Sequence, residues 1–171
     1  MGDRSVTRNS GPDLARVGAG LPVAAYRDEI TTALQGRRAV IVAPPGTGKT
    51  TFVPPLVASR CSGRVIVTQP RRVAARAAAR RLATLTGTRP GAFASHTVRG
   101  ESTTTRDTKV EFVTTGVLLR RLLNDPDLTG VDAVILDEVH ERHLDADLVV
   151  AMVCEVAPVS YTHLRAHETS L

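Results

Sequence analysis

The chain has 171 residues, of which 42% are hydrophobic, so its composition fits one folded domain with a sizeable core and argues against a disordered chain. Its 22 Lys and Arg residues exceed its 17 Asp and Glu residues, which gives a net charge of +5 at pH 7. The excess is arginine, since Lys49 and Lys109 are the only lysines. Arginine favours phosphate-bearing partners such as nucleic acid, although a genome rich in G and C would produce the same bias.

Cysteine content and hydropathy indicate the cellular compartment in which the protein is expected. Cys61 and Cys154 are too few and too far apart for a disulfide framework or a zinc site, and they fit a reducing environment. No apolar run approaches the length of a membrane span, and the N-terminus lacks a signal-peptide or myristoylation pattern. The sequence therefore predicts a cytoplasmic protein without a membrane partner.

The first elements are expected to lead into a strand. Residues 1–20 mix Gly, Ser, Asp, Arg and Pro without apolar periodicity, which predicts a mobile leader outside the core. From Leu21 onward, apolar residues including Val23 and Tyr26 recur at spacings of three and four, which predicts an amphipathic helix ending near Gly36. Residues 38–43 then predict the first strand.

The stretch that follows this strand, residues 43–51, reads APPGTGKTT. Gly46 and Gly48 can adopt backbone angles closed to other residues, so amide N–H groups can turn toward a phosphate while Lys49 adds a positive charge. Ala43 replaces the first glycine of the GxxxxGK[ST] pattern, and a small residue still permits the turn. The stretch predicts a nucleotide site, with an ordinary Gly/Pro turn as the alternative. Its residues are Pro45, Gly46, Thr47, Gly48, Lys49, Thr50 and Thr51, with Thr50 as a Mg²⁺ ligand.

Two helices and a strand are expected next. A helix should begin near Gly48, with its positive end toward the phosphates, and Pro54 and Pro55 should kink or shorten it. Residues 64–68 predict a β-branched strand, after which Pro70 opens a helix. That helix has one apolar face and one basic face, formed by Ala74, Ala78, Leu82 and Leu85 and by Arg72, Arg76 and Arg80. The basic face is either solvated or bound to a polyanion, with Arg71 and Arg72 as the first phosphate contacts.

The middle of the chain gives a weaker signal. Residues 93–99 predict a strand and residues 101–107 a turn, and residues 109–113 alternate charged and apolar positions as in a half-buried strand. A helix over residues 117–123 should follow Thr114-Thr115-Gly116. The hydroxyls and glycine of that stretch can hydrogen-bond a sugar-phosphate backbone, but they are equally ordinary helix-capping residues.

A strongly apolar strand, residues 132–136, delivers Asp137-Glu138-Val139-His140 to its C-terminal end. Ligands of open α/β sheets bind at that edge. Asp137 can hold Mg²⁺ through water, and Glu138 can orient and deprotonate the water that attacks a γ-phosphate. His140 and His143 do not have the HExxH spacing, so zinc is not favoured.

Together these stretches resemble the DEAH-box group of superfamily 2 helicases, and within it the bacterial HrpB-type members. The likeness covers about residues 20–157 and rests on four blocks: APPGTGKTT from Ala43, TQPRRVAARAAARRLA from Thr68, FVTTGVLLRRL from Phe112 and LDEVHERHLDADL from Leu136. The box reads DEVH, with Val139 where the family name has Ala.

The resemblance implies an α/β fold, namely a RecA-like P-loop NTPase domain with a mainly parallel sheet and helices on both faces. It implies ATP and Mg²⁺ as cofactors, Lys49, Asp137 and Glu138 as catalytic residues, and Thr50 and Asp137 as metal ligands. It also implies movement along RNA or another single-stranded nucleic acid. The contacts to that strand would be Arg71, Arg72, Thr115 and Gly116, and His140 would couple the strand to the ATP site.

The C-terminal part departs from the family pattern. A second RecA-like domain with its arginine fingers is missing, and so is the Ser-Ala-Thr block, so we expect residues 21–157 to form a first RecA-like domain that hydrolyses ATP hardly at all on its own. Residues 158–171 read as a non-native tail, and removal of residues 159–171 should leave stability nearly unchanged. A P-loop ATPase of another class and a catalytically incomplete nucleotide- or RNA-binding fragment remain as alternatives.

Overall fold

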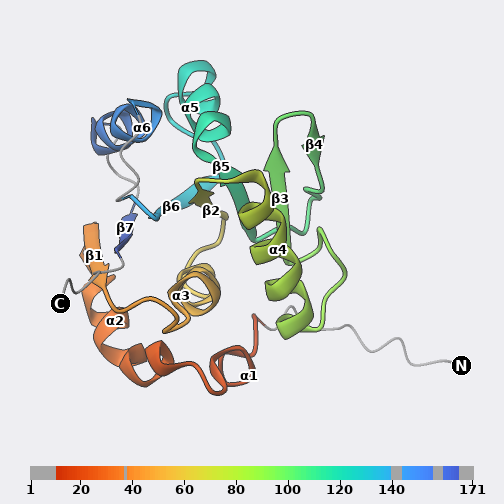
Figure 1. Ribbon diagram of the computed structural model, residues 1–171, viewed down its shortest axis with the longest axis vertical. Helices are drawn as coiled ribbons and strands as arrows, with labels where there is room; N and C mark the ends of the chain where they lie inside the picture. Colours follow the sequence, from red (N-terminus) through yellow and green to blue (C-terminus); the bar gives the residue numbers. More distant parts are fainter. Residues whose placement is uncertain (1–10, 37, 140–143, 156–159, 166–171) are drawn as a thin grey trace, which may run out of the picture.

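The computed structural model describes residues 11–36, 38–139, 144–155 and 160–165. Helices and strands alternate along the chain around one sheet of seven strands, in the order β1-β7-β6-β2-β5-β3-β4. Every pairing in it is parallel except that of the β3–β4 hairpin. Helices cover both faces (Figure 1). The predicted α/β fold with a mainly parallel sheet is confirmed.

The elements have the following bounds. The strands are β1 (Arg38–Val42), β2 (Arg64–Gln69), β3 (Ala94–Val98), β4 (Glu101–Ser102), β5 (Val110–Thr114), β6 (Val131–Asp137) and β7 (Ser160–Arg165). The helices are α1 (Leu14–Gly18), α2 (Arg27–Ala33), α3 (Lys49–Ala58), α4 (Arg72–Thr86), α5 (Thr115–Asn124) and α6 (Leu144–Glu155), and η1 (Pro22–Tyr26) is a 3-10 helix. Among the described residues, none of these helices is long and apolar enough to cross a membrane.

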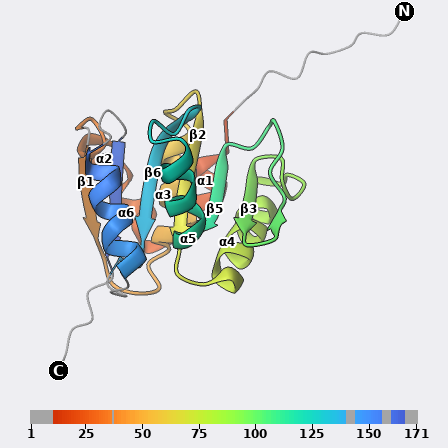
Figure 2. The same cartoon turned by 90° about the horizontal axis from the view of Figure 1, so that it is seen from above.

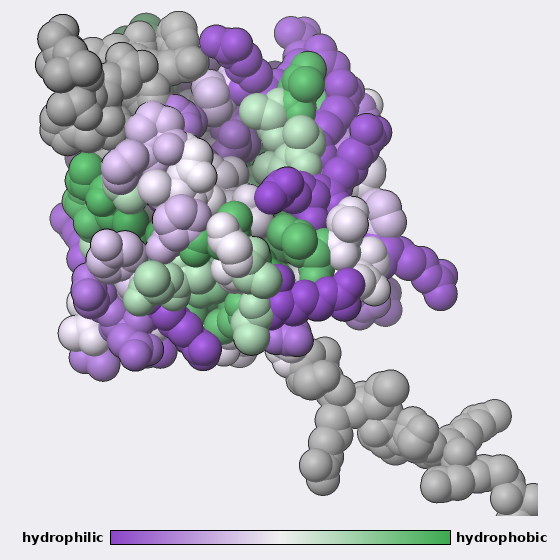
Figure 3. All heavy atoms as spheres, turned by 60° about the horizontal axis from the view of Figure 1, so that its bottom comes forward, coloured by the Kyte–Doolittle hydropathy of each residue, from purple (hydrophilic) through white to green (hydrophobic). Residues whose placement is uncertain are grey.

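Two apolar cores lie on opposite faces of the sheet. One includes Val65 and Phe112 and packs against α1, α3 and α4, whereas the other includes Ile66 and Val113 and packs against α5 and α6. Neighbouring residues of a strand point to opposite faces, so β2 and β5 contribute to both cores. Figure 2 shows α5 and α6 together on one side of the sheet. On the other side, Figure 3 shows apolar patches between hydrophilic side chains.

The parallel arrangement brings the sequence blocks to one edge of the sheet. The carboxyl ends of β1, β2, β5 and β6 point the same way, because these strands are linked by parallel pairings. They are followed by the phosphate loop, by Pro70 and α4, by α5, and by Glu138, in that order. All four blocks that carry the family resemblance therefore reach the edge at which such sheets bind ligands.

The N-terminal prediction is wrong for part of residues 1–20. Asp13 caps α1, since its Oδ1 accepts hydrogen bonds from the backbone N–H groups of Ala15 and Arg16, both at 3.1 Å. Val17 is 1% exposed and belongs to the core that contains Phe52. A five-residue helix is too short to show apolar periodicity, so the sequence pattern gave no sign of it. Residues 1–10 lie outside the described part.

The single helix predicted between Leu21 and Gly36 is divided into η1 and α2. Val23 and Ile30 are buried as expected, but Tyr26 is 56% exposed although the pattern placed it on the apolar stripe. The tighter winding of a 3-10 helix rotates its side chains relative to an α-helix, so a stripe counted at 3.6 residues per turn fails across the junction.

The expectation that residues 158–171 lie outside the fold is wrong for β7. The backbone of β7 pairs in parallel with β1 on one side and β6 on the other, with Tyr161 opposite Arg38 and Leu164 opposite Asp137. A strand in this place satisfies the backbone groups of two neighbours that would otherwise be open edges. The non-native origin of residues 158–171 stays a prediction.

Helices α3 and α4 differ from their predicted form. The two prolines do not end α3, which continues through them to Ala58 and buries every side chain from Phe52 onward. This packing offsets the cost of about 3 kcal/mol that a proline imposes in a helix interior. In α4 the buried face is shifted by one residue from the prediction for its first two turns, and consists of Ala75, Ala79, Leu82 and Ala83.

Strand β5 is buried more fully than its alternating pattern predicted. Val110, Glu111, Phe112 and Val113 are all buried, and Glu111 is 0% exposed. The half-buried strand inferred from the charged position is therefore wrong. A buried carboxylate needs hydrogen-bonding or charged partners, and these come from elements distant in the sequence.

Candidate nucleotide site and nucleic-acid face

The turn between β1 and α3 has the backbone shape of a phosphate-binding loop. Gly46 and Gly48 have φ values of 76° and 90°, which other residues rarely adopt. A Cβ atom at Gly48 would also lie 2.9 Å from the Leu21 side chain, whereas one at Gly46 would meet nothing within 4 Å. The loop is anchored by Thr47, whose Oγ1 donates to the Pro44 carbonyl at 2.9 Å and whose carbonyl accepts from Val23 N at 3.0 Å.

Lys49 places its charge inside this turn. Lys49 is 7% exposed, and its Nζ donates to the carbonyl oxygens of Ala43 at 2.6 Å and Pro44 at 2.9 Å. Lys49 is also the first residue of α3, so the positive end of the helix faces the loop. An ammonium group held by carbonyl oxygens beside free helix N–H groups is suited to phosphate oxygens.

The phosphate loop and the DEVH stretch are joined by a hydrogen bond. Thr50 Oγ1 donates to Asp137 Oδ2 at 2.5 Å, although the two residues are 87 positions apart in the sequence. Gln69 Nε2 donates to the same oxygen at 2.7 Å, and Glu138 N donates to Asp137 Oδ1 at 3.0 Å. A hydroxyl and a carboxylate in contact are the hard oxygen ligands that Mg²⁺ prefers.

Burial raises the pKa of Asp137 above its ordinary value, although hydrogen bonds from Thr50, Gln69 and Glu138 and the charge of Lys49 act in the opposite direction. Asp137 is 5% exposed. The hydrogen bonds therefore do not fully offset the cost of burying the charged carboxylate. A bound cation would favour the ionised form.

Glu138 adopts a left-handed backbone conformation, with φ of 57°. Such a conformation costs a non-glycine residue about 1–3 kcal/mol and clusters at functional sites. Glu138 and Asp137 line a cavity of about 160 Å³ that is also lined by Thr115 and Gly116. The carboxylates at the end of β6 and the residues at the start of α5 thus share one space.

The remaining nucleotide-site residues are placed as follows. Thr51 lies in the first turn of α3, where its N–H donates to the Gly48 carbonyl at 3.1 Å, and Pro45 is exposed in the loop. His140 and His143 lie outside the described residues. Among the described residues, no three His, Cys, Asp or Glu side chains are grouped as a metal cluster.

The predicted nucleic-acid contacts lie at the same edge of the sheet. Arg71 and Arg72 are exposed at the start of α4, and Arg72 Nη2 donates to the Arg99 carbonyl at 3.3 Å. Thr115 and Gly116 begin α5. Thr114 is the N-cap residue of α5, but its side chain makes no capping hydrogen bond, which gives no support to a capping role for that hydroxyl.

A groove that the sequence did not reveal begins at Gly116. Its volume is about 660 Å³, and it lies between the β3–β4 hairpin and α5. Arg99 lines one wall, and Arg120 and Arg121 line the other. Arg120 follows Gly116 by four residues and so shares its helix face, which is the signal that could have identified it. Arg99 lies on the hairpin, and no local pattern pointed to it.

Comparison with known proteins places the chain in a family. A family model for DEAD/DEAH box helicases matches residues 26–149. The chain belongs to this family. The ATP-dependent RNA helicase HrpB of Escherichia coli strain K12 is 43% identical over 139 residues, which are 80% of this chain and 17% of that protein. The human protein named probable ATP-dependent RNA helicase DHX34 is 36% identical over 146 residues, 85% of this chain and 13% of that protein.

Solved structures agree with this assignment to the DEAD/DEAH box helicases. The crystal structure of the E. coli DEAH/RHA helicase HrpB matches with a TM-score of 0.83 and 38% sequence identity, over 88% of this chain and 20% of that chain. The resemblance predicted from the four sequence blocks is confirmed, and so is the RecA-like fold. This DEAD/DEAH box helicase chain spans less than a fifth of the length of the two curated relatives.

Proposed function

We propose that the chain is the ATP-binding, first RecA-like domain of an ATP-dependent RNA helicase. The contact of Thr50 Oγ1 with Asp137 Oδ2 at 2.5 Å carries this proposal, because it joins the phosphate loop to the DEVH carboxylate. The names of the relatives support RNA as the substrate. Family membership favours a helicase over a P-loop ATPase of another class.

The chain's own residues hold the nucleotide and its metal. The N–H groups of the glycine-containing loop and of the start of α3 bind phosphate oxygens. Lys49 Nζ gives up its hydrogen bonds to the Ala43 and Pro44 carbonyl oxygens and donates to the phosphate oxygens instead. Thr50 and Asp137 would hold Mg²⁺. When bound, Mg²⁺ supplies positive charge that offsets charge developing on the phosphates.

Glu138 is positioned to act on water. It follows Asp137 directly, and its left-handed backbone turns the chain at the end of β6. A half-buried carboxylate beside the metal site can orient a water molecule and accept its proton as general base. Glu138 is therefore assigned to hydrolysis rather than to binding.

The nucleic-acid strand is expected to run along the carboxyl edge of the sheet. Arg71, Arg72 and Arg99 supply guanidinium groups for phosphates, and Gly116 exposes backbone at the start of α5. Thr115 adds a hydroxyl, and Arg120 extends the path into the groove. Contacts of this kind fix position without reading sequence.

Full turnover depends on groups beyond these. A second RecA-like domain would supply the arginines that stabilise transferred phosphate charge, and the 20% coverage of the solved HrpB chain leaves room for one. His140 remains our candidate for coupling the two sites. Two free cysteines, Cys61 and Cys154, accord with a cytoplasmic location.

The phosphate site is tested by comparing the chain's two lysines. Lys49→Ala should weaken binding of a fluorescent ATP analogue with Mg²⁺ by about a hundredfold, since two charge-assisted hydrogen bonds contribute about 3 kcal/mol. Lys109→Ala is the matched control, because Lys109 Nζ donates to the Ser62 carbonyl at 2.6 Å and takes no part in the loop. Unchanged affinity in Lys49→Ala would contradict the proposal.

Single-turnover hydrolysis separates the helicase domain from a binding fragment. The isolated chain should bind MgATP and hydrolyse it hardly at all, because an arginine finger contributes about a thousandfold or more in rate. Glu138→Gln should leave binding intact and stop turnover in a protein that includes the second domain. Brisk hydrolysis by the isolated chain would overturn the two-domain mechanism.

The nucleic-acid face is tested with arginines near opposite ends of the parallel strands. The double substitution Arg71→Ala, Arg72→Ala should weaken RNA binding for any sequence and reduce the salt slope by about 2, because two phosphates are no longer neutralised. Arg60→Ala, an exposed arginine after the C-terminal end of α3, is the control. An unaltered salt slope in the double variant would leave Arg71 and Arg72 as a solvated pair.

A further inference from the structure

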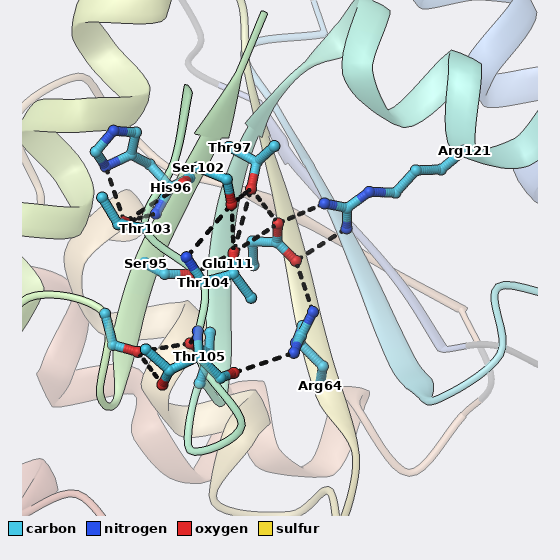
Figure 4. Close-up of polar contacts among 12 residues, drawn as sticks. Arg64, Ser95, His96, Thr97, Ser102, Thr103, Thr104, Thr105, Glu111 and Arg121 are labelled. Atoms are coloured by element: carbon cyan, nitrogen blue, oxygen red, sulfur yellow. Dashed lines mark hydrogen bonds and ion pairs between the residues drawn. The ribbon is translucent and has the colours of Figure 1, made fainter. Parts of the chain in front are cut away.

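One buried carboxylate, Glu111, contacts both walls of the groove that begins at Gly116. From the α5 wall, Arg121 Nη1 donates to Oε2 at 2.9 Å and Nη2 donates to Oε1 at 2.5 Å. From the hairpin wall, Thr97 Oγ1 donates to Oε1 at 2.5 Å. Figure 4 shows Glu111 between these two sets of donors. The same two segments, Thr97 to Gly100 and Gly116 to Asn124, line the groove.

Two further groups complete this cluster without entering the groove. Thr104 Oγ1 donates to Glu111 Oε1 at 3.1 Å, and Arg64 Nη1 donates to Oε2 at 3.1 Å. Glu111 is 0% exposed, whereas the side chains of Arg64 and Arg121 are 28% and 32% exposed. The hydrogen bonds therefore hold the Glu111 carboxylate in one orientation, and they also hold the side chains that donate them.

The position of α5 matters because its first residues are Thr115 and Gly116. A helix whose start binds a phosphate backbone has to be held at a set distance from the opposite wall, where Arg99 lies. Among the described residues, Arg121 is the residue of α5 that hydrogen-bonds to Glu111. A bidentate Arg–carboxylate pair restrains orientation as well as distance.

We propose that Glu111 is a positioning residue for nucleic-acid binding, which holds α5 and the β3–β4 hairpin at the spacing that a phosphate backbone requires. The inference rests on the proposed function, because it assumes that RNA occupies this groove. Glu111 itself is buried below the groove and acts through Arg121 and Thr97.

The direction in which one substitution changes RNA affinity distinguishes a positioning role from a purely electrostatic effect. Glu111→Gln removes a negative charge near arginines, so a purely electrostatic effect would tighten RNA binding and leave the salt slope equal or steeper. A positioning role predicts the reverse, namely weaker binding by about three- to tenfold and a shallower slope, because fewer phosphates are contacted at once. A role in stability alone would lower the melting temperature without changing RNA affinity.

The measurement is fluorescence anisotropy of a labelled oligouridylate with the whole chain, at several KCl concentrations. Arg64→Gln is the matched control, because it removes an ionic partner of Glu111 but leaves both walls joined to the carboxylate. We expect Arg64→Gln to lower stability and to keep RNA affinity, and Glu111→Gln to change both. Unchanged or tighter RNA binding by folded Glu111→Gln would overturn the proposal.

A second variant decides the matter if Glu111→Gln does not fold. Thr97→Val removes the hydroxyl through which the hairpin wall contacts Glu111 and keeps a β-branched side chain in its place. It should weaken RNA binding by about twofold, and unchanged affinity would overturn the proposal. The Arg71→Ala, Arg72→Ala variant runs alongside. If it fails to weaken RNA binding, the RNA-binding part of the proposed function fails, whereas an effect there with none at Glu111 removes only the positioning role.

Discussion

Asp137 and Glu111 are both buried carboxylates on central strands, but their surroundings balance their charges differently. Asp137 accepts hydrogen bonds from two side chains without formal charge, Thr50 and Gln69. Glu111 accepts hydrogen bonds from two guanidinium groups, those of Arg64 and Arg121. The end of β6 and the middle of β5 therefore present opposite electrostatic situations within one sheet.

The pKa values follow this difference. Burial raises the pKa of Asp137, and its hydrogen bonds do not reverse the shift. Burial also acts to raise the pKa of Glu111, but hydrogen bonds from Arg121 and Thr97 and the arginine charges hold it below its ordinary value. Glu111 has its countercharge in two neighbouring arginines, whereas the side chains that hydrogen-bond to Asp137 carry no formal charge. This difference supports our proposals that Glu111 joins elements and that Asp137 binds a ligand.

The largest effect should come from removing the strand beside Asp137. Deleting residues 158–171 removes β7, which pairs with β1 and β6. Each backbone hydrogen bond contributes about 1 kcal/mol, so the loss of a strand paired on both sides should lower the melting temperature clearly and weaken MgATP binding. Thermal melts of the two chains check this. An unchanged melting temperature would show that this segment does not stabilise the fold, as the sequence predicts for a tail.

Glu111→Gln should have the next largest effect on stability. Removing one partner of a buried ion pair leaves the other uncompensated, and because both arginines keep some access to water we expect a loss of about 3 kcal/mol. Asp137→Asn, measured without nucleotide, should change the free energy of unfolding by less than about 1 kcal/mol, since it removes a charge that burial already disfavours. Urea unfolding of both variants measures these two changes in the free energy of unfolding. Equal decreases in the two variants would contradict the distinction between the two carboxylates.

The smallest effect is expected at an exposed carboxylate, Glu101. Contacts with Arg76 and His96 lower its pKa from 4.5 to about 2. Because the folded value is the lower one, this stabilisation is present above pH 4.5 and is lost as the pH falls toward about 2. The stability difference between the wild type and Glu101→Gln should shrink across that window in urea titrations. A difference independent of pH would show that these side chains do not act through charge.

Local patterns in the sequence predicted the candidate functional residues that lie at the carboxyl ends of the strands. Gly46, Lys49 and Thr50 were identified because a phosphate loop is a contiguous motif, and Asp137 because it follows an apolar strand. Glu111 was missed because its partners come from β2, β3 and α5, and no local pattern reports which strands are neighbours. The parallel pairing of β7 was missed for the same reason.

The central claim is that Asp137 binds a metal and Glu111 does not, and the Mg²⁺ dependence of ATP affinity tests it most directly. The affinity of each variant for a fluorescent ATP analogue is measured with Mg²⁺ and with EDTA. We predict that Asp137→Asn loses the gain in affinity that Mg²⁺ gives the wild type, and that Glu111→Gln keeps it. Retention of the full gain by Asp137→Asn, or its loss in Glu111→Gln, would contradict this account.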